Sequence, residues 1–260
     1  MPLEPARALL TDRVAVVTGA AVGIGRATTL ALARFGADVA VCDRDGENLT
    51  TLVKGVEGVG RAAVADVLDV REPEAVASFC AAVGERFRRV DVLVNNAGGG
   101  FHADFLDVNL KGLDALVREN FSSVTHFVRA IAPLMTDGGS IVNLTSIEAH
   151  RAAPGYAIYS AQKAAVASLT KSLALELGER RIRVNCVAPD LIPTPGVGQI
   201  PGPPRSPLPV AGDVDDVAAA IVFLAGDLSR FVTGTTVHVD AGMWAAGGWH
   251  RGDDGRFTTS

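Results

Sequence analysis

The chain has 260 residues, 48% of them hydrophobic and 20% charged, and its formal net charge is −5. This composition rules out general disorder and leaves ample chain for a sizeable core, and the acidic balance argues against nucleic-acid binding. Three scattered cysteines and five histidines indicate neither a disulfide framework nor a metal site. Because there is no signal-peptide pattern and no apolar run long enough to span a membrane, we expect a soluble, cytoplasmic protein.

Short apolar runs alternate with longer helical patterns along the chain. The expected strands are Val14–Val17, Asp38–Cys42, Ala62–Val67, Val90–Val94, Ser140–Leu144, Ile182–Val187 and Thr235–Val239, and the expected helices include Gly23–Phe35, Glu74–Phe87, Tyr156–Leu177 and Val214–Ala225. Strands of this kind are typical of a parallel sheet that is covered on both faces. The alternation predicts right-handed βαβ units and a doubly wound α/β fold. We expect residues 1–260 to form one domain, since no repeat or composition break divides them.

Two segments depart from this alternation. Thr194–Pro209 is too rich in proline and glycine to form a helix, so a substrate-side loop is expected there. Met243–Ser260 shows neither helical nor strand periodicity and reads as a loop-like tail. One hypothesis is that Trp244, Trp249 and His250 cover an active site, either their own or that of a neighbouring subunit; the alternative is a solvated tail.

The segment TGAAVGIG at 18–25 follows the first expected strand and leads into a helical pattern. A tight turn that leads directly into a helix N-terminus brings unpaired N–H groups close to a pyrophosphate. The spacing is GxxxGxG rather than the common GxGxxG, and such a turn can serve the backbone alone. Its position between a strand and a helix favours dinucleotide binding.

Asp43 ends the second expected strand, 20 residues after Gly23. A carboxylate at this place can accept hydrogen bonds from the adenosine ribose, and it would repel a 2′-phosphate by roughly 4 kcal/mol at about 4 Å and an effective dielectric near 20. Asp43 therefore favours NAD over NADP. The neighbouring Arg44 could reduce this preference if it turned inward, and a plain strand-end aspartate remains the alternative.

Tyr159 and Lys163 stand four residues apart on one face of an expected helix. An ammonium group nearby favours the phenolate and lowers a tyrosine pKa, so this pair can act as general acid and base on an alcohol or ketone. Ser146 ends a strand and could bind the substrate oxygen. Alone, the pair would more often be an ordinary surface contact.

Taken together, these residues resemble the short-chain dehydrogenase/reductase family in its ordinary single-domain form. The matching segments are TGAAVGIG at 18–25, Asp66-Val67, Asn95-Asn96-Ala97-Gly98, Asn120, Ser146, Tyr159 to Lys163, Pro189 to Thr194, and Val239-Asp240-Ala241-Gly242. Their order and spacing fit from about Asp12 to Gly242. The resemblance implies a three-layer Rossmann fold with a seven-stranded parallel sheet and usually a homotetramer, less often a dimer.

The resemblance also implies a role for each matching position. Tyr159 would transfer the proton, Ser146 would bind the substrate oxygen, Lys163 would bind the nicotinamide ribose and lower the tyrosine pKa, and Asn120 would hold a water in a proton relay. Asp66 and Val67 would contact adenine, Asn96 the adenosine-side ribose, and Ile192 and Thr194 the carboxamide. With the residues considered above, the expected cofactor-binding set is Gly19, Val22, Gly23, Ile24, Gly25, Asp43, Arg44, Asp66, Val67, Asn96, Ala97, Gly98, Tyr159, Lys163, Pro189, Ile192 and Thr194.

Two positions differ from the usual family pattern. Asp190 stands where the family usually has glycine, which raises a question about the backbone near the nicotinamide. Ala241 replaces another glycine and is expected to be tolerated. Glu148 and His150, after Ser146, and Phe101 and His102, after the Asn-Ala-Gly motif, are candidates for the substrate side, although ordinary loop roles are more common.

The expected function is therefore that of an NAD-dependent oxidoreductase which interconverts a secondary alcohol and a ketone. The alternatives are an NADPH-dependent carbonyl reductase, a dehalogenase-like lyase on the same fold, and a non-catalytic dinucleotide-binding protein. Lys163 and the glycine-rich turn argue against the lyase, and the joint presence of Asn120, Ser146, Tyr159 and Lys163 argues against the non-catalytic protein. A small or medium-sized neutral substrate is weakly favoured, and the sequence does not name it.

Overall fold

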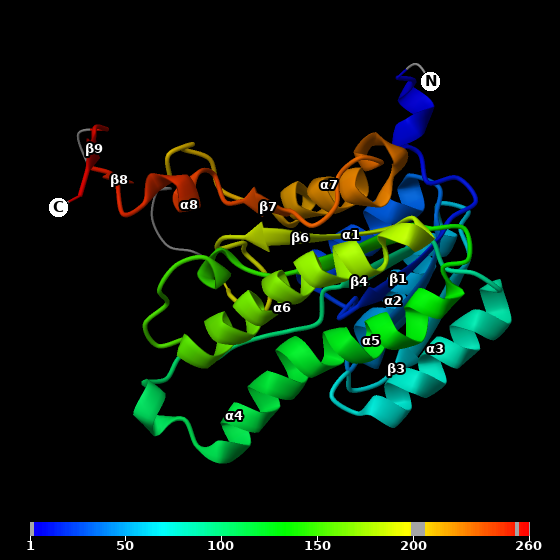
Figure 1. Cartoon of the computed structure of the whole chain (residues 1–260), viewed down its shortest axis with the longest axis horizontal. Helices are drawn as coiled ribbons and strands as arrows, with labels where there is room; N and C mark the ends of the chain where they lie inside the picture. The colour runs from blue at the N-terminus through cyan, green and yellow to red at the C-terminus, as the bar shows by residue number, and fades with distance from the viewer. Residues whose placement is uncertain (1–2, 199–205, 253–254, 260) are drawn as a thin grey trace.

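The computed structural model describes residues 3–198, 206–252 and 255–259 (Figure 1). Seven parallel strands form its main sheet in the order β3-β2-β1-β4-β5-β6-β7. Their bounds are Val14–Thr18 (β1), Asp38–Asp43 (β2), Ala63–Val67 (β3), Val92–Asn95 (β4), Gly139–Leu144 (β5), Ile182–Pro189 (β6) and Thr236–Val239 (β7). This arrangement confirms the predicted Rossmann-type sheet, and every expected strand is found within two residues at each end.

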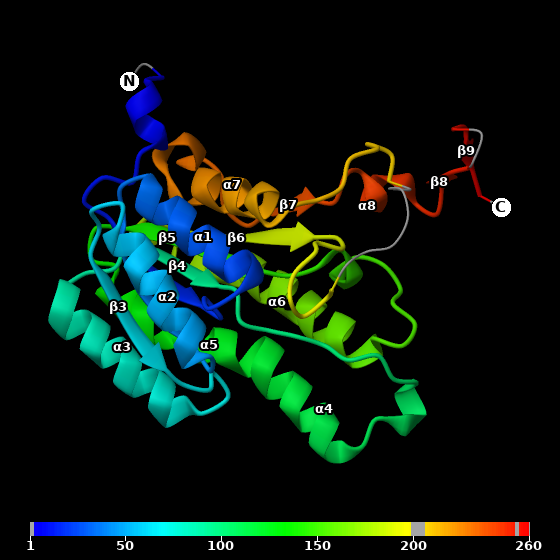
Figure 2. The ribbon, with the colours of Figure 1, turned by 180° about the vertical axis from the view of Figure 1, so that it is seen from behind.

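Helices cover both faces of the sheet. They are Gly23–Arg34 (α1), Gly46–Glu57 (α2), Pro73–Phe87 (α3), Leu110–Val117 (α4), Ser123–Ile131 (α5), Ala157–Glu176 (α6) and Val214–Ala225 (α7). One apolar cluster joins α1, α2 and α7 to one face, and a second joins α3, α5 and α6 to the other, as the opposite views in Figures 1 and 2 show. Neighbouring strand residues serve opposite clusters, Val17 the first and Val16 the second, because side chains alternate across a sheet.

The strand order reverses direction between β1 and β4, because the chain builds outward from β1 to β3 and then returns to the other side. In open sheets of this type, ligands bind outside the carboxyl ends of the strands at such a switch point. The segments that follow β1, β2, β4, β5 and β6 therefore define where a site is to be sought.

A chain of buried polar side chains crosses the sheet beneath this edge. Asn95 on β4 donates to Asn143 on β5 at 2.8 Å, and Asn143 donates to Thr170 on α6 at 2.8 Å. The thiol of Cys186 on β6 also donates to the Thr170 hydroxyl, at 3.1 Å. These bonds satisfy polar groups inside the core and fix α6 in one rotation against the sheet.

The two irregular segments turn out differently. Residues 199–205 of the expected substrate-side loop lie outside the described residues, and the described positions on either side of them form turns rather than helix. The tail does contain short elements, contrary to the prediction: α8 (Met243–Ala246) and a two-stranded hairpin of β8 (His250–Arg251) with β9 (Phe257–Thr258). Arg251 ties this hairpin to the carbonyl of Pro207 at 2.8 Å. Such short elements carry no periodicity that a sequence reading could detect.

Nowhere in the described ranges does a helix have both the length and the apolar character that a bilayer crossing would need.

Candidate active site

The glycine-rich turn after β1 is crowded at its glycine positions. Gly19 and Gly23 have left-handed backbone, with φ of 64° and 56°. A Cβ atom on Gly19 would lie 2.8 Å from the Cα of Ala97, and one on Gly23 would lie 3.1 Å from the methyl group of Thr194. The turn is thus packed between the segments that follow β4 and β6, and glycine is required by both conformation and space.

The helix that follows this turn has free donors at its N-terminus. Val22 occupies the N-cap of α1, and no side chain caps that helix, whereas Asp45 caps α2 and Asp213 caps α7. The first N–H groups of a helix lack internal partners and carry a partial positive charge. These N–H groups could bind the pyrophosphate of a dinucleotide, and this is the position that the sequence predicts for the pyrophosphate.

Asp43 connects the end of β2 to the glycine-rich turn. One of its carboxylate oxygens accepts a hydrogen bond from the N–H of Ala21 at 2.9 Å, and the other accepts one from Asp45 at 3.2 Å. Val67, at the end of the neighbouring β3, is 59% exposed and offers an apolar surface at this edge. A carboxylate beside an apolar side chain suits the ribose and base of an adenosine.

Asn96 supports the turn from the other side. Its side-chain amide donates to the carbonyls of Thr18 and Gly19 at 3.0 and 2.8 Å, and the hydroxyl of Thr18 accepts from the N–H groups of Asn96 and Ala97. Every polar bond here holds the β1 turn against the end of β4. In the described structure, the role of Asn96 is to shape the turn.

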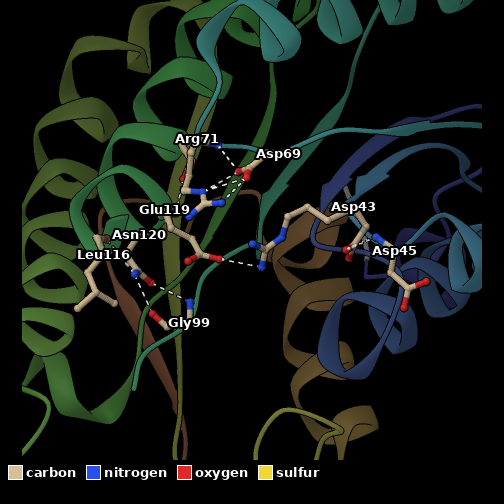
Figure 3. Close-up of polar contacts among 10 residues, drawn as sticks. Asp43, Asp45, Asp69, Arg71, Gly99, Leu116, Glu119 and Asn120 are labelled. Carbon is tan, nitrogen blue, oxygen red and sulfur yellow. Dashed lines mark hydrogen bonds and ion pairs between the residues drawn. The ribbon is translucent and has the colours of Figure 1, made fainter. Parts of the chain in front are cut away.

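Asn120 lies in a π-helical turn, Arg118–Ser122, between α4 and α5. Its side-chain oxygen accepts from the N–H of Gly99 at 3.1 Å, while its amide donates to the carbonyls of Gly99 and Leu116 at 2.8 and 3.0 Å (Figure 3). An inserted π-turn widens a helix locally and is frequent at functional sites. Here it fastens the helix to the chain that follows β4.

Ser146, Tyr159 and Lys163 meet at the carboxyl edge of β5. The Ser146 hydroxyl accepts from the N–H of Glu148 at 3.2 Å and is hydrogen-bonded to Tyr159. Burial raises the pKa of Tyr159, the hydrogen bond from Ser146 opposes that rise, and the charge of Glu148 adds to it. This direction is opposite to the lowering expected from Lys163, because burial of the phenol outweighs the other influences.

Lys163 is buried, and its ammonium donates to the carbonyl of Leu144 at 2.9 Å. Its nitrogen lies 5.7 Å from the centre of the Tyr159 ring. Burial lowers the pKa of Lys163 to about 8, and the charge of Glu119 works in the opposite direction. A Cβ atom on Gly98 would lie 2.9 Å from the Lys163 nitrogen, so that glycine closes directly over the lysine.

The segment after β6 packs against the start of α1. Ile192 is buried, and the methyl group of Thr194 lies against the position of Gly23. The concern about Asp190 is not met, since its backbone lies outside the left-handed region. Ala241, which we expect to be tolerated, does lie in the left-handed region, at φ 50°.

Charged side chains line the region beside Ser146. Arg151 pairs with Glu148 at 2.7 Å and with Asp190 at 3.5 Å, which links the loop after β5 to the end of β6. Burial raises the pKa of Asp190, and the charge of Arg151 opposes this. Two carboxylates around one guanidinium leave a net negative charge at this place.

Aromatic side chains form two groups of ring contacts near Tyr159 and near the loop after Ser146. His102 packs edge-on against Tyr156 at 5.4 Å between ring centres, and Tyr156 lies 6.5 Å from Tyr159. On the tail side, Trp244 stacks on His238 at 4.9 Å, and His238 contacts His150 at 4.8 Å. The tail of the same chain thus reaches the loop after Ser146 through Trp244 and His238, although Trp244 and Trp249 are both about half exposed.

The structure therefore gathers the residues selected from sequence along one edge of the sheet. Two residues that the sequence reading passed over also lie there. Glu119 precedes Asn120 and pairs with Arg44, and Arg151 joins Glu148 to Asp190. The only feature of the sequence that could have pointed to Glu119 is its position next to Asn120, and no feature of the sequence pointed to Arg151.

Comparison with known proteins identifies close relatives. A family model described as enoyl-(acyl carrier protein) reductase matches residues 19–244. The chain is 38% identical over 242 residues to 3-oxoacyl-(acyl-carrier-protein) reductase FabG of Thermotoga maritima, a match that covers 90% of this chain and 98% of that protein. It is 35% identical over 263 residues to cyclohexanol dehydrogenase of Rhodococcus sp., covering 90% and 97%. Carveol dehydrogenase of Mycobacterium avium, solved in complex with NAD, superposes with a TM-score of 0.84 at 32% identity, covering 89% and 97%.

Proposed function

The chain belongs to the short-chain dehydrogenase/reductase family and is an NAD(P)-dependent oxidoreductase acting on CH–OH groups; from this premise we propose that it oxidises a secondary alcohol with NAD, using Tyr159 as the general acid and base. The observation that carries the proposal is the junction of Ser146, Tyr159 and Lys163 at the carboxyl edge of β5. The bound nicotinamide would accept or supply the hydride.

Each side chain of this junction has one task in the proposed reaction. The Ser146 hydroxyl binds the substrate oxygen, and the Tyr159 hydroxyl takes its proton during oxidation or returns it during reduction. The ammonium of Lys163 favours the phenolate that forms at Tyr159. Since burial raises the Tyr159 pKa, the proposed proton transfer depends on that ammonium and on the hydrogen bond from Ser146.

Cofactor binding is assigned to the turn, the strand ends and the segment after β6. The pyrophosphate would meet the free N–H groups of α1, the adenosine would lie between Asp43 and Val67, and the nicotinamide end would lie near Ile192 and Thr194. Asp43 supports NAD rather than NADP, because its carboxylate is fixed at the β2 end and would face a 2′-phosphate of like charge.

The walls near Tyr159 favour a neutral substrate of small or medium size. His102 and Tyr156 offer apolar ring surface, while Glu148 and Asp190 outnumber Arg151 and disfavour a carboxylate. We further propose a cytoplasmic protein that assembles as a homotetramer or homodimer. The outward apolar side chains Leu106 and Leu110, 91% and 83% exposed, support assembly.

The experiment that tests this proposal is a fluorescence titration of the purified protein with NADH and NADPH in parallel, followed by initial rates on a panel of neutral secondary alcohols. We expect NADPH to bind about tenfold more weakly or worse, a difference of roughly 1.4 kcal/mol. Tighter binding of NADPH would replace the proposal with an NADPH-dependent carbonyl reductase. Binding of neither nucleotide would refute catalysis by this site.

A further inference from the structure

Glu119 lies on the π-turn that follows α4. Figure 3 shows it between Asn120 on one side and Asp43 on the other, with Arg71 and Asp69 nearby. Its side chain is 21% exposed, and it pairs with the guanidinium of Arg44 at 3.5 Å. We propose that Glu119 is a cofactor-specificity residue: by pairing with Arg44, it keeps that guanidinium from neutralising a 2′-phosphate. This inference rests on the proposed preference for NAD.

The Arg44 side chain connects the end of β2 with the π-turn between α4 and α5. It starts directly after Asp43 at the end of β2 and ends at the π-turn, which Asn120 fastens to Gly99 in the segment after β4. The ion pair therefore joins the end of β2 to a turn that Asn120 holds against the segment after β4, and β2 and β4 lie on either side of β1. Both charged groups lie near Asp43 and the uncapped N-terminus of α1, where we expect the nucleotide to bind.

The other arginines around Glu119 direct their hydrogen bonds to other partners, although the charge of Glu119 also acts on Arg71. Arg71 donates from Nε to both carboxylate oxygens of Asp69, at 2.9 and 3.0 Å. Arg118 donates to the carbonyl of Arg71 at 2.7 Å and pairs with Glu72 at 3.1 Å. Arg44, whose side chain is 60% exposed, has a long contact to Glu119 and remains able to turn. It is thus the guanidinium best placed to move toward a phosphate group beside Asp43.

The two cofactors differ in what they require of this arginine. A ribose 2′-hydroxyl needs no cation, so pairing of Arg44 with Glu119 leaves NAD binding almost unaffected. A 2′-phosphate beside Asp43 needs a cation, and Arg44 can supply one only by leaving Glu119. An exposed ion pair is weak, so we expect Glu119 to change the ratio of affinities by a modest factor and Asp43 to contribute the larger share.

The test compares ligands that occupy only the adenosine half of the site. Binding of 5′-AMP and 2′,5′-ADP is measured by calorimetry, with NADH and NADPH as full-length ligands, on the wild-type protein and on Glu119→Gln, Arg44→Gln and the double variant. Glu72→Gln is the matched control, because it removes a carboxylate whose ion-pair partner is Arg118 rather than Arg44. Thermal unfolding of each variant establishes that it is folded.

We expect Glu119→Gln to tighten 2′,5′-ADP and NADPH about fivefold, or roughly 1 kcal/mol, with less than about a twofold change for 5′-AMP and NADH. The gain should disappear in the Arg44→Gln background and be absent from Glu72→Gln. An unchanged ratio in Glu119→Gln, or an equal gain without Arg44, overturns the inference while leaving a wild-type preference for NADH intact. A wild-type protein that prefers NADPH overturns both the inference and the proposed cofactor.

Discussion

Replacing Lys163 with methionine should make the protein more stable near neutral pH while removing its activity. Burial lowers the pKa of Lys163 to about 8 from an ordinary value of 10.5. At 1.36 kcal/mol for each pKa unit, the buried ammonium destabilises the folded protein by roughly 3 kcal/mol at pH 7. Methionine removes this penalty but leaves the Leu144 carbonyl without its donor, which costs about 1–3 kcal/mol. The expected net gain is therefore small, about 1 kcal/mol.

The pH dependence is the sharper part of this prediction. Between pH 8 and 10.5 the unfolded chain still binds the lysine proton and the folded protein does not, so the unfolding free energy of the wild type rises with pH. From pH 7 to 9.5 this rise is about 2 kcal/mol. The variant lacks the group, so its stability advantage should reverse over the same interval.

Urea unfolding at pH 7 and pH 9.5, extrapolated linearly to water, measures this difference. Lys171→Met is the matched control, since Lys171 is exposed on the same helix. Its removal should change the unfolding free energy by the same amount at pH 7 and at pH 9.5. A stability difference between wild type and Lys163→Met that does not change with pH would refute a lowered lysine pKa. Activity above a few per cent of wild type would refute the role of Lys163 at Tyr159.

Two further substitutions test the packing around the site. Gly98→Ala places a methyl group 2.8 Å from the side-chain oxygen of Asn120 and 2.9 Å from the nitrogen of Lys163. We expect kcat to fall about tenfold or more because these atoms must shift, whereas Gly178→Ala, which adds a methyl group in open space, should leave kcat unchanged; equal rates for both would contradict the contact. Ala241→Gly should raise the unfolding free energy by about 0.5–1 kcal/mol, since relief of a left-handed alanine exceeds the added chain entropy. A lower urea midpoint would show that Ala241 is not strained.

The sheet was predictable because its signal is local. Strands such as Asp38–Asp43 and Ile182–Pro189 are mostly apolar and buried, and each is bounded by turn residues that the sequence displays. Their order required only the right-handed crossover rule and the family resemblance. The tail was wrongly expected to lack regular structure, because α8 and the β8–β9 hairpin are held by contacts such as Arg251 with Pro207 rather than by any periodic pattern.

The reaction centre was predictable for a different reason. Tyr159 and Lys163 are close in sequence, and Ser146 ends a recognisable strand, so spacing placed them together. Arg44 and Glu119 are 75 residues apart and meet only because the π-turn between α4 and α5 folds against the end of β2. The direction of the Tyr159 pKa was also out of reach, since the depth of burial of a phenol is a property of the packed structure.

The buried polar chain of Asn95, Asn143, Thr170 and Cys186 has a consequence for how this protein can change over generations. Thr170 lies two turns beyond Lys163 on the same face of α6, so a helix that lost its hydrogen bonds to the sheet could rotate and carry the lysine away from Leu144. Substitutions of one apolar core residue by another leave these hydrogen bonds unchanged. Selection for activity therefore also acts on the Asn143 amide and the Thr170 hydroxyl, although neither contacts a substrate. The interior of this protein consequently tolerates fewer substitutions than its apolar composition implies.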